Sequence, residues 1–166
     1  KTKCPYCDFN TYQGIDDLMG PFLPALTTEI DFWGKTLARP RVKSVFFGGG
    51  TPSYLPAGYI EQILVSIQAS FQVDADAEIT IEANPDDLDA AACAGILGQG
   101  VNRLSIGVQS LDNSLLHLLG RRHLASEAIQ AFQTARQAGF DNVNLDLMYG
   151  LPSQSMDQWG QTLDSL

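Results

Sequence analysis

Short runs of alternating apolar and polar residues recur from residue 40 onward, separated by longer stretches with helical periodicity. A period of two is typical of strands and a period near 3.6 is typical of helices. The alternating runs predict four strands at residues 42–48, 77–83, 102–108 and 142–148. The other stretches predict helices at residues 16–37, 57–71, 87–99 and 113–139, and a last one from residue 156. Gly120 breaks the fourth of these helices into two. Strands that alternate with helices indicate repeated βα units and a parallel sheet.

The predicted strands carry polar side chains on one of their two faces. In the second strand, Glu78, Thr80 and Glu82 oppose Ile79 and Ile81. A strand buried on both faces of a parallel sheet usually reads as a continuous apolar run, and these strands do not. We therefore expect the apolar faces to pack on helices and the polar faces to line the interior of a barrel that holds a polar ligand or water. The fold class predicted is α/β, a partial barrel of parallel strands that is incomplete at both ends, with residues 1–166 as one domain.

Charge and cysteine content narrow the function classes. The chain has 10 basic and 19 acidic residues, for a net charge of -9, and this argues against a nucleic-acid groove. The composition predicts no transmembrane segment, and no signal peptide is visible. Three cysteines do not form the even framework of a secreted disulfide protein, so a reducing, cytoplasmic location is predicted.

Candidate ligand-binding residues stand where the predicted strands end. Ligands of parallel α/β folds bind at the carboxyl ends of the strands. Four successive strands end in a bare backbone, a carboxylate, an amide and a second carboxylate: Gly49, Gly50, Thr51, Glu82, Gln109 and Asp146. Arg121 follows the third strand and adds a positive charge. An amino acid joined to a ribose offers an ammonium for Glu82, a carboxylate for Arg121 and hydroxyls for Asp146 and Gln109. S-adenosylmethionine carries all of these groups.

Each of these residues also has an ordinary interpretation. GGGTP fits a tight turn, and it lacks the pattern of a phosphate-binding loop. Glu82 or Asp146 alone fits a solvated carboxylate or a helix cap, and Arg121 fits a surface ion pair, as does Arg122. His123 is expected to be a capping or surface histidine. The shared edge of the predicted sheet is what favours a site.

Cys4 and Cys7 form a CxxC pair with three open interpretations. A structural zinc site needs two further ligands at suitable spacing, and the other cysteine and the histidines are scattered. CPYC is also the active-site sequence of glutaredoxins, although such a motif should follow a strand and open a helix. The third interpretation is an iron–sulfur motif. Cys93, in a predicted helix, is expected to be a buried structural thiol.

The motifs CPYC, FFGGGTPSYL, EITIEANPDDL, GVNRLSIGVQSLD, LGRRH and NLDLMYGLPSQ together resemble the radical S-adenosylmethionine family. Within it they are similar to the oxygen-independent coproporphyrinogen III oxidase group and its haem-chaperone relatives. The resemblance implies a partial (β/α)6 barrel and a 4Fe-4S cluster held by a CxxxCxxC motif. It also implies S-adenosylmethionine bound to the open iron, and reductive cleavage of that cofactor to a 5′-deoxyadenosyl radical.

Carried over by motif, Cys4 and Cys7 match the second and third cluster ligands, and the first would stand directly before Lys1. The resemblance assigns the cofactor contacts to the strand-end set and the arginine: Gly49, Gly50, Thr51, Glu82, Gln109, Arg121 and Asp146. Tyr6 and Phe9 would shield the cluster.

Phe9 decides the branch of the family that the chain resembles most. The oxidases carry a further cysteine at this position, whereas the haem chaperones do not. The resemblance therefore implies a haem chaperone that binds haem or a porphyrin, with a flavodoxin or ferredoxin as electron donor. Three alternatives stay open: a coproporphyrinogen III oxidase that decarboxylates propionates, a CPYC redox protein, and an inactive fragment. The chaperones' C-terminal HNxxYW signature would lie beyond Leu166.

Overall fold

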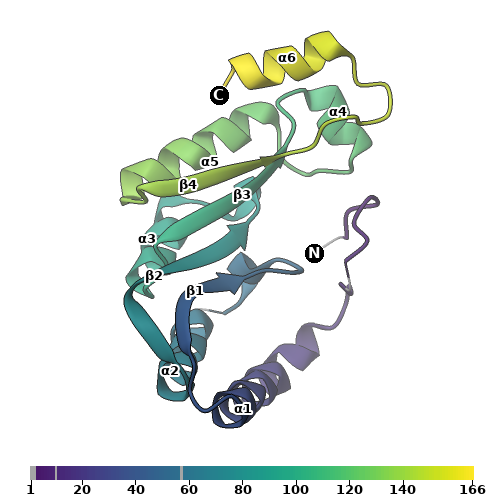
Figure 1. The fold of residues 1–166 in the computed structure, drawn as a ribbon. Coiled ribbons are helices and arrows are strands. Elements are labelled where there is room, and N and C mark those ends of the chain that lie inside the picture. The colour runs from purple at the N-terminus through teal and green to yellow at the C-terminus, as the bar shows by residue number, and fades with distance from the viewer. Residues whose placement is uncertain (1–2, 10, 57) are drawn as a thin grey trace.

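A parallel sheet of four strands in the order β1-β2-β3-β4 forms the centre of the fold (Figure 1). The structure, a computed structural model, describes residues 3–9, 11–56 and 58–166. The strands are β1 (Arg41–Phe47), β2 (Gln72–Ala83), β3 (Arg103–Gln109) and β4 (Asn142–Leu147). All three neighbouring pairs run parallel, which confirms the predicted βα organisation.

The helices lie where the periodicity predicts them. They are α1 (Met19–Thr36), α2 (Tyr59–Ser70), α3 (Ala90–Gly98), α4 (Asn113–Leu118), α5 (Ala125–Ala138) and α6 (Met156–Asp164). Short 3-10 turns occupy Asp16–Leu18, Pro52–Tyr54 and Pro85–Asp87. The predicted break near Gly120 is confirmed, since α4 and α5 flank it. Ala57, where the second helix was predicted to begin, lies outside the described residues.

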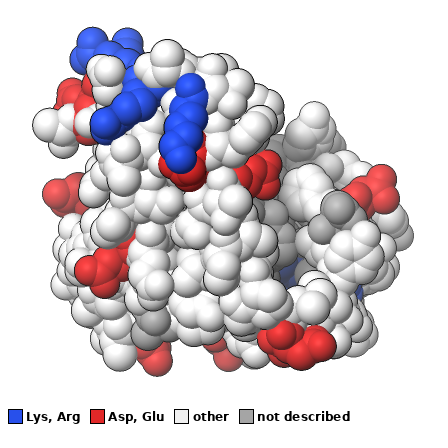
Figure 2. Space-filling view, turned by 90° about the horizontal axis from the view of Figure 1, so that it is seen from below, with Lys and Arg blue, Asp and Glu red and all other residues white. Residues whose placement is uncertain are grey.

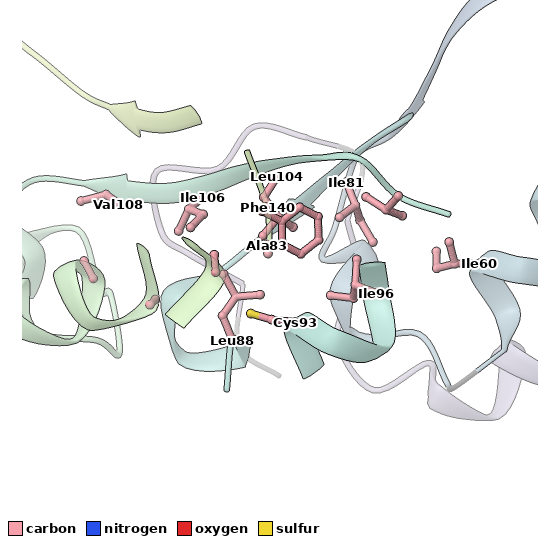
Figure 3. Packing of buried hydrophobic residues seen from close by; sticks show 14 of the residues in the cluster. Ile60, Ile81, Ala83, Leu88, Cys93, Ile96, Leu104, Ile106, Val108 and Phe140 are labelled. Carbon is pink, nitrogen blue, oxygen red and sulfur yellow. The ribbon is translucent and has the colours of Figure 1, made fainter. Parts of the chain in front are cut away.

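The apolar faces of the strands form the core with α2, α3 and α5 (Figures 1 and 3). Ile81, Leu104 and Ile106 of the sheet are fully buried, as is Phe140, which follows α5. Cys93 lies in this cluster, where burial raises the pKa of its thiol. The interpretation of Cys93 as a buried structural thiol is therefore confirmed.

The opposite face of the sheet is polar and internally hydrogen-bonded. Thr80 is buried and shares hydrogen bonds with Glu78 and with Arg103 of the neighbouring strand. Closer to the strand ends, Ser105 on β3 donates to Asp146 on β4. The predicted division into an apolar helix-covered face and a polar face is confirmed.

Strand β2 extends further toward its N-terminus than the predicted residues 77–83. Its first half pairs with the start of β1 across a bulge: Val42 pairs with Val73, and Ser44 pairs with Glu78. An ion pair between Arg41 and Asp74 adds to this pairing. The extension depends on pairing with β1, which the period of β2 alone does not reveal.

Charged side chains are spread over the surface seen in Figure 2. Acidic residues are scattered across that face, while most of the visible basic surface lies at its upper left. Among the described residues, no helix has both the length and the apolar character needed to cross a membrane.

Candidate functional site

A cavity of about 790 Å³ lies at the carboxyl ends of the strands, between them and the N-terminal segment. Its walls include eight of the nine predicted site residues: Cys4, Cys7, Gly50, Thr51, Glu82, Gln109, Arg121 and Asp146. The ninth, Gly49, is bonded through its N–H to Glu82. Residues far apart in the sequence therefore face one space.

Glu82 supplies a half-buried carboxylate near the end of β2. Its Oε2 accepts a hydrogen bond from the backbone N–H of Gly49, with 3.1 Å between N and Oε2. Burial raises the pKa of Glu82, the Gly49 N–H opposes that effect, and the charge of Asp146 adds to it. A cationic ligand group beside this carboxylate would favour the ionised form.

The glycine segment after β1 brings bare backbone to the same cavity. Gly49 has a φ of +81°, and a side chain there would meet no heavy atom within 4 Å. A Cβ on Gly48, by contrast, would come within 2.7 Å of the Phe46 ring and 3.4 Å of Glu82 Oε2. Glycine at position 49 thus allows the turn, and glycine at position 48 leaves room for the carboxylate of Glu82.

Arg121 joins several walls of the cavity. Its Nη2 donates to the backbone carbonyl of Gly107 at 2.6 Å and to Asn84 Oδ1 at 2.8 Å. Its Nη1 lies 3.4 Å from Tyr6 Oη and 3.7 Å from Cys4 Sγ. Its buried Nε has no hydrogen-bond partner among the described residues. The surface ion-pair interpretation of Arg121 is thus wrong, while that of Arg122 is confirmed by its contact with Asp86.

Asp146 and Gln109 lie at the ends of the last two strands. Asn144 Nδ2 donates to Asp146 Oδ1 at 2.6 Å, and Ser105 Oγ lies 3.0 Å from Oδ2. Gln109 is a non-glycine residue with a φ of +68°, at a register shift between β3 and β4. Both side chains face the cavity, one held by neighbours and the other aimed by its backbone.

Cys4 and Cys7 lie in a turn closed by a hydrogen bond from Cys7 N to Cys4 O at 3.0 Å. Both thiols are free and half-buried. Within residues 3–9 and 11–56, the first helical turn begins at Asp16, so Cys7 does not open a helix as in the glutaredoxin arrangement. No group of three or more His, Cys, Asp or Glu side chains suited to a metal ion occurs in the described part of the chain, which leaves the zinc interpretation without a ligand set.

Sequence reasoning missed one residue of this site, gave a second only part of its role, and misplaced a third that lies beside the site. Asn84 follows β2 directly and bridges Arg121 to Thr51, whose Oγ1 lies 3.4 Å from Asn84 Nδ2. Tyr6 was assigned to shielding alone, yet it contacts Arg121, and burial raises the pKa of its phenol. His123 is 2% exposed, so the expectation of a capping or surface histidine is wrong. The signal for Asn84 was its place in the strand-end segment EANP.

Comparison with known proteins places this chain in a family. The family model described as "Radical SAM superfamily" matches residues 1–166. The chain is 42% identical to the mitochondrial radical S-adenosyl methionine domain-containing protein 1 of Mus musculus, covering 99% of this chain and 37% of that protein. It is 41% identical to the heme chaperone HemW of Escherichia coli K12, covering 94% of this chain and 42% of that protein. The chain thus spans about two fifths of these relatives' length.

Solved structures agree with the sequence relatives. The structure of coproporphyrinogen III oxidase (HemN) from Escherichia coli, a radical SAM enzyme, superposes with a TM-score of 0.86 at 31% identity, covering 99% of this chain and 38% of that one. Elp3 of Methanocaldococcus infernus, at 21% identity and a TM-score of 0.66, shares the fold. The predicted α/β barrel fold is therefore confirmed. On the match over its whole length and on these relatives, the chain belongs to the radical SAM superfamily.

Proposed function

We propose that the cavity binds S-adenosylmethionine beside a 4Fe-4S cluster ligated by Cys4 and Cys7, and that the full-length protein is a haem chaperone. The observation that carries this proposal is the convergence of residues from four strand ends and the cysteine loop on one cavity. Radical SAM proteins as a family use these two cofactors.

The cavity's chemistry fits S-adenosylmethionine. The half-buried Glu82 carboxylate, whose pKa is raised by burial, suits an ammonium group. The buried Arg121 Nε is left without a partner among the described residues and suits a carboxylate. The open backbone at Gly49 and Gly50 admits a ligand at close range. Two half-buried thiols on the adjoining loop suit iron as two of the three cysteine ligands of a CxxxCxxC motif.

Each side chain then has a defined task in binding. When bound, the cluster and cofactor supply one-electron reduction and radical chemistry. Glu82 and Arg121 orient the amino-acid end of the cofactor. Asp146 and Gln109 hold the ribose hydroxyls. Tyr6 and Phe9 line the cavity beside the cysteine loop, with 37% and 65% of their surface exposed.

Phe9 favours the chaperone over the oxidase. It stands where the oxidases of this group carry a further cysteine, and its ring lines the cavity. Relatives named heme chaperone HemW match at 40% identity in Bacillus subtilis and 41% in Escherichia coli. The ligand we propose is accordingly haem, with coproporphyrinogen oxidation as the alternative because of the likeness to HemN. The electron donor is proposed to be a flavodoxin or ferredoxin.

The cellular location of the protein is part of the same proposal. A cytoplasmic location remains our prediction from cysteine content, although several relatives carry "mitochondrial" in their names.

The test is anaerobic reconstitution of the full-length protein with iron and sulfide. Iron content and the visible spectrum report the cluster, and calorimetry reports S-adenosylmethionine binding. The Cys4→Ala variant should lose the cluster, while Cys93→Ala should keep it because Cys93 is buried in the core. Haem titration and a coproporphyrinogen assay follow. Stoichiometric haem binding without turnover supports the chaperone, and turnover establishes the oxidase instead.

A further inference from the structure

The imidazole of His123 is buried next to the candidate site without lining it. The residue is 2% exposed, and its Nε2 lies 3.1 Å from the carbonyl oxygen of Val108. A carbonyl only accepts hydrogen bonds, so Nε2 carries the proton and donates. Nδ1 has no partner among the described residues, as suits the unprotonated nitrogen of a neutral ring. Burial, aided by the charge of Arg121, lowers the pKa of His123 and favours this neutral form.

The carbonyl that His123 holds lies in an unusual stretch of backbone. Val108 stands within the register shift that separates Gly107 from Gln109, and its side chain points into the core (Figure 3). Gln109 follows with a φ of +68°. A non-glycine residue keeps a left-handed conformation only where its surroundings hold it.

Hydrogen-bond donors account for every carbonyl of this stretch. The Gly107 carbonyl accepts from Arg121 at 2.6 Å. The Val108 carbonyl accepts from His123 and from the N–H of Ser110, the latter at 2.9 Å. The Gln109 carbonyl accepts from the N–H of Met148 at 2.8 Å. The two side-chain donors therefore come from one short segment, residues 121–123, which is hydrogen-bonded to the end of β3.

The bulge in turn directs the side chain of Gln109. A Cβ on Gly107 would lie 3.0 Å from Gln109 Nε2, so the amide group passes close over the bare backbone of Gly107. Gln109 thereby reaches the cavity wall. A change in the backbone at Val108 would move this amide directly.

We propose that His123 is a positioning residue of the cofactor site: its Nε2–H holds the Val108 carbonyl and fixes the bulge that aims the Gln109 amide into the cavity. This inference rests on the proposed cofactor site and assigns a role to a residue that touches no ligand. His123 acts through Gln109, whereas Arg121 also faces the cavity itself.

The test compares S-adenosylmethionine affinity, by calorimetry, among reconstituted full-length variants. His123→Leu removes the donor and should weaken binding on the order of tenfold, at the low end of the losses found when partners that orient metal ligands are removed. His123→Gln should bind like the wild type, because an amide Nε2 can donate from a similar place. His123→Met is a second variant without the donor, and its flexible side chain fits the same space if His123→Leu folds poorly.

A double-mutant cycle separates positioning from a general structural effect. Once Gln109→Ala has removed the amide, adding His123→Leu should cause no further loss of affinity. Additive losses would overturn the role, as would equal affinity of His123→Leu and the wild type.

A second readout needs no cofactor. In the ligand-free protein, amide hydrogen exchange at residues 109–110 should be faster in His123→Leu than in His123→Gln. Equal exchange rates would also overturn the positioning role. A wild type that fails to bind S-adenosylmethionine would instead contradict the proposed function.

Discussion

Glu82 on β2 and Gly49 after β1 are joined by a hydrogen bond from the Gly49 N–H to Glu82 Oε2, with 3.1 Å between the two atoms. The contact links two neighbouring strand ends and holds the carboxylate at the cavity wall. Burial is the main influence on the Glu82 carboxylate, and it raises the pKa of this residue. Protonation of this residue is therefore expected to control ligand binding.

S-adenosylmethionine affinity should rise as the pH increases through the raised pKa of Glu82, because an ammonium group binds the ionised carboxylate. Above that pKa the affinity should level off. Glu82→Gln should bind on the order of tenfold more weakly or worse and lose this part of the pH profile. Calorimetry across the acid-to-neutral range measures both effects. Glu61→Gln, on α2 outside the cavity, is the control and should behave like the wild type.

The raised pKa of Glu82 also predicts how the stability of the ligand-free protein depends on pH. A carboxyl group with a raised pKa in the fold keeps its proton to higher pH than in the unfolded chain. Between the unfolded and folded pKa values, the free energy of unfolding therefore falls as the pH rises. Glu82→Gln should lack this decline. A parallel pH dependence of unfolding in the two proteins would contradict the burial of Glu82.

Arg121→Met should destabilise the fold by about 1–3 kcal/mol, because it leaves the Gly107 carbonyl and Asn84 Oδ1 without their donor. The matched control is Arg122→Met, which removes only a partly exposed ion pair with Asp86 and should cost less than about 1 kcal/mol. Urea unfolding gives both values. Equal effects of the two substitutions would show that Arg121 contributes no more than a surface charge.

Asp146→Ala should weaken S-adenosylmethionine binding on the order of tenfold while the protein stays folded, since the ribose hydroxyls lose a charged acceptor. Asp141→Ala is the control, because Asp141 is exposed at the other end of β4 and lies outside the cavity lining. Calorimetry measures the affinities and circular dichroism the fold. Unchanged affinity in Asp146→Ala would count against the assignment.

Gly120→Ala should lower cluster content, because the added Cβ would come within 2.8 Å of Pro5 and push the cysteine loop away. Gly150→Ala is matched in backbone strain, with a φ of +68° against +66° for Gly120, and its Cβ would meet nothing within 4 Å. Iron analysis after reconstitution distinguishes the two. Equal iron loss in both variants would assign the effect to backbone strain and not to displacement of the cysteine loop.

Local pattern sufficed for β1, β3, β4 and the second half of β2, and for most of the candidate site. A strand residue's face follows from its position, and parallel strands present their carboxyl ends at one edge. Glu82, Gln109 and Asp146 could therefore be placed together without knowledge of any contact. The break at Gly120 and the buried Cys93 were also predictable, because both follow from properties of a single helix.

Contacts between distant segments account for what the sequence did not reveal. His123 is buried because it reaches the Val108 carbonyl, fifteen positions earlier in the chain, and nothing in GRRH itself indicates that partner. Asn84 gains its place from Arg121, thirty-seven positions away. The left-handed backbone of Gln109 depends on pairing with β4 and on donors from another segment. Such features belong to the assembled fold.

The strand order also has a consequence for how the protein is made. Because each strand pairs with its successor, the sheet can grow in the order of synthesis, one βα unit at a time. The contact between Cys4 and Arg121, in contrast, spans 117 positions. The cysteine loop therefore cannot make its contact with Arg121 until β3 and α4 have left the ribosome. We expect iron–sulfur assembly to be a late event in the maturation of this protein.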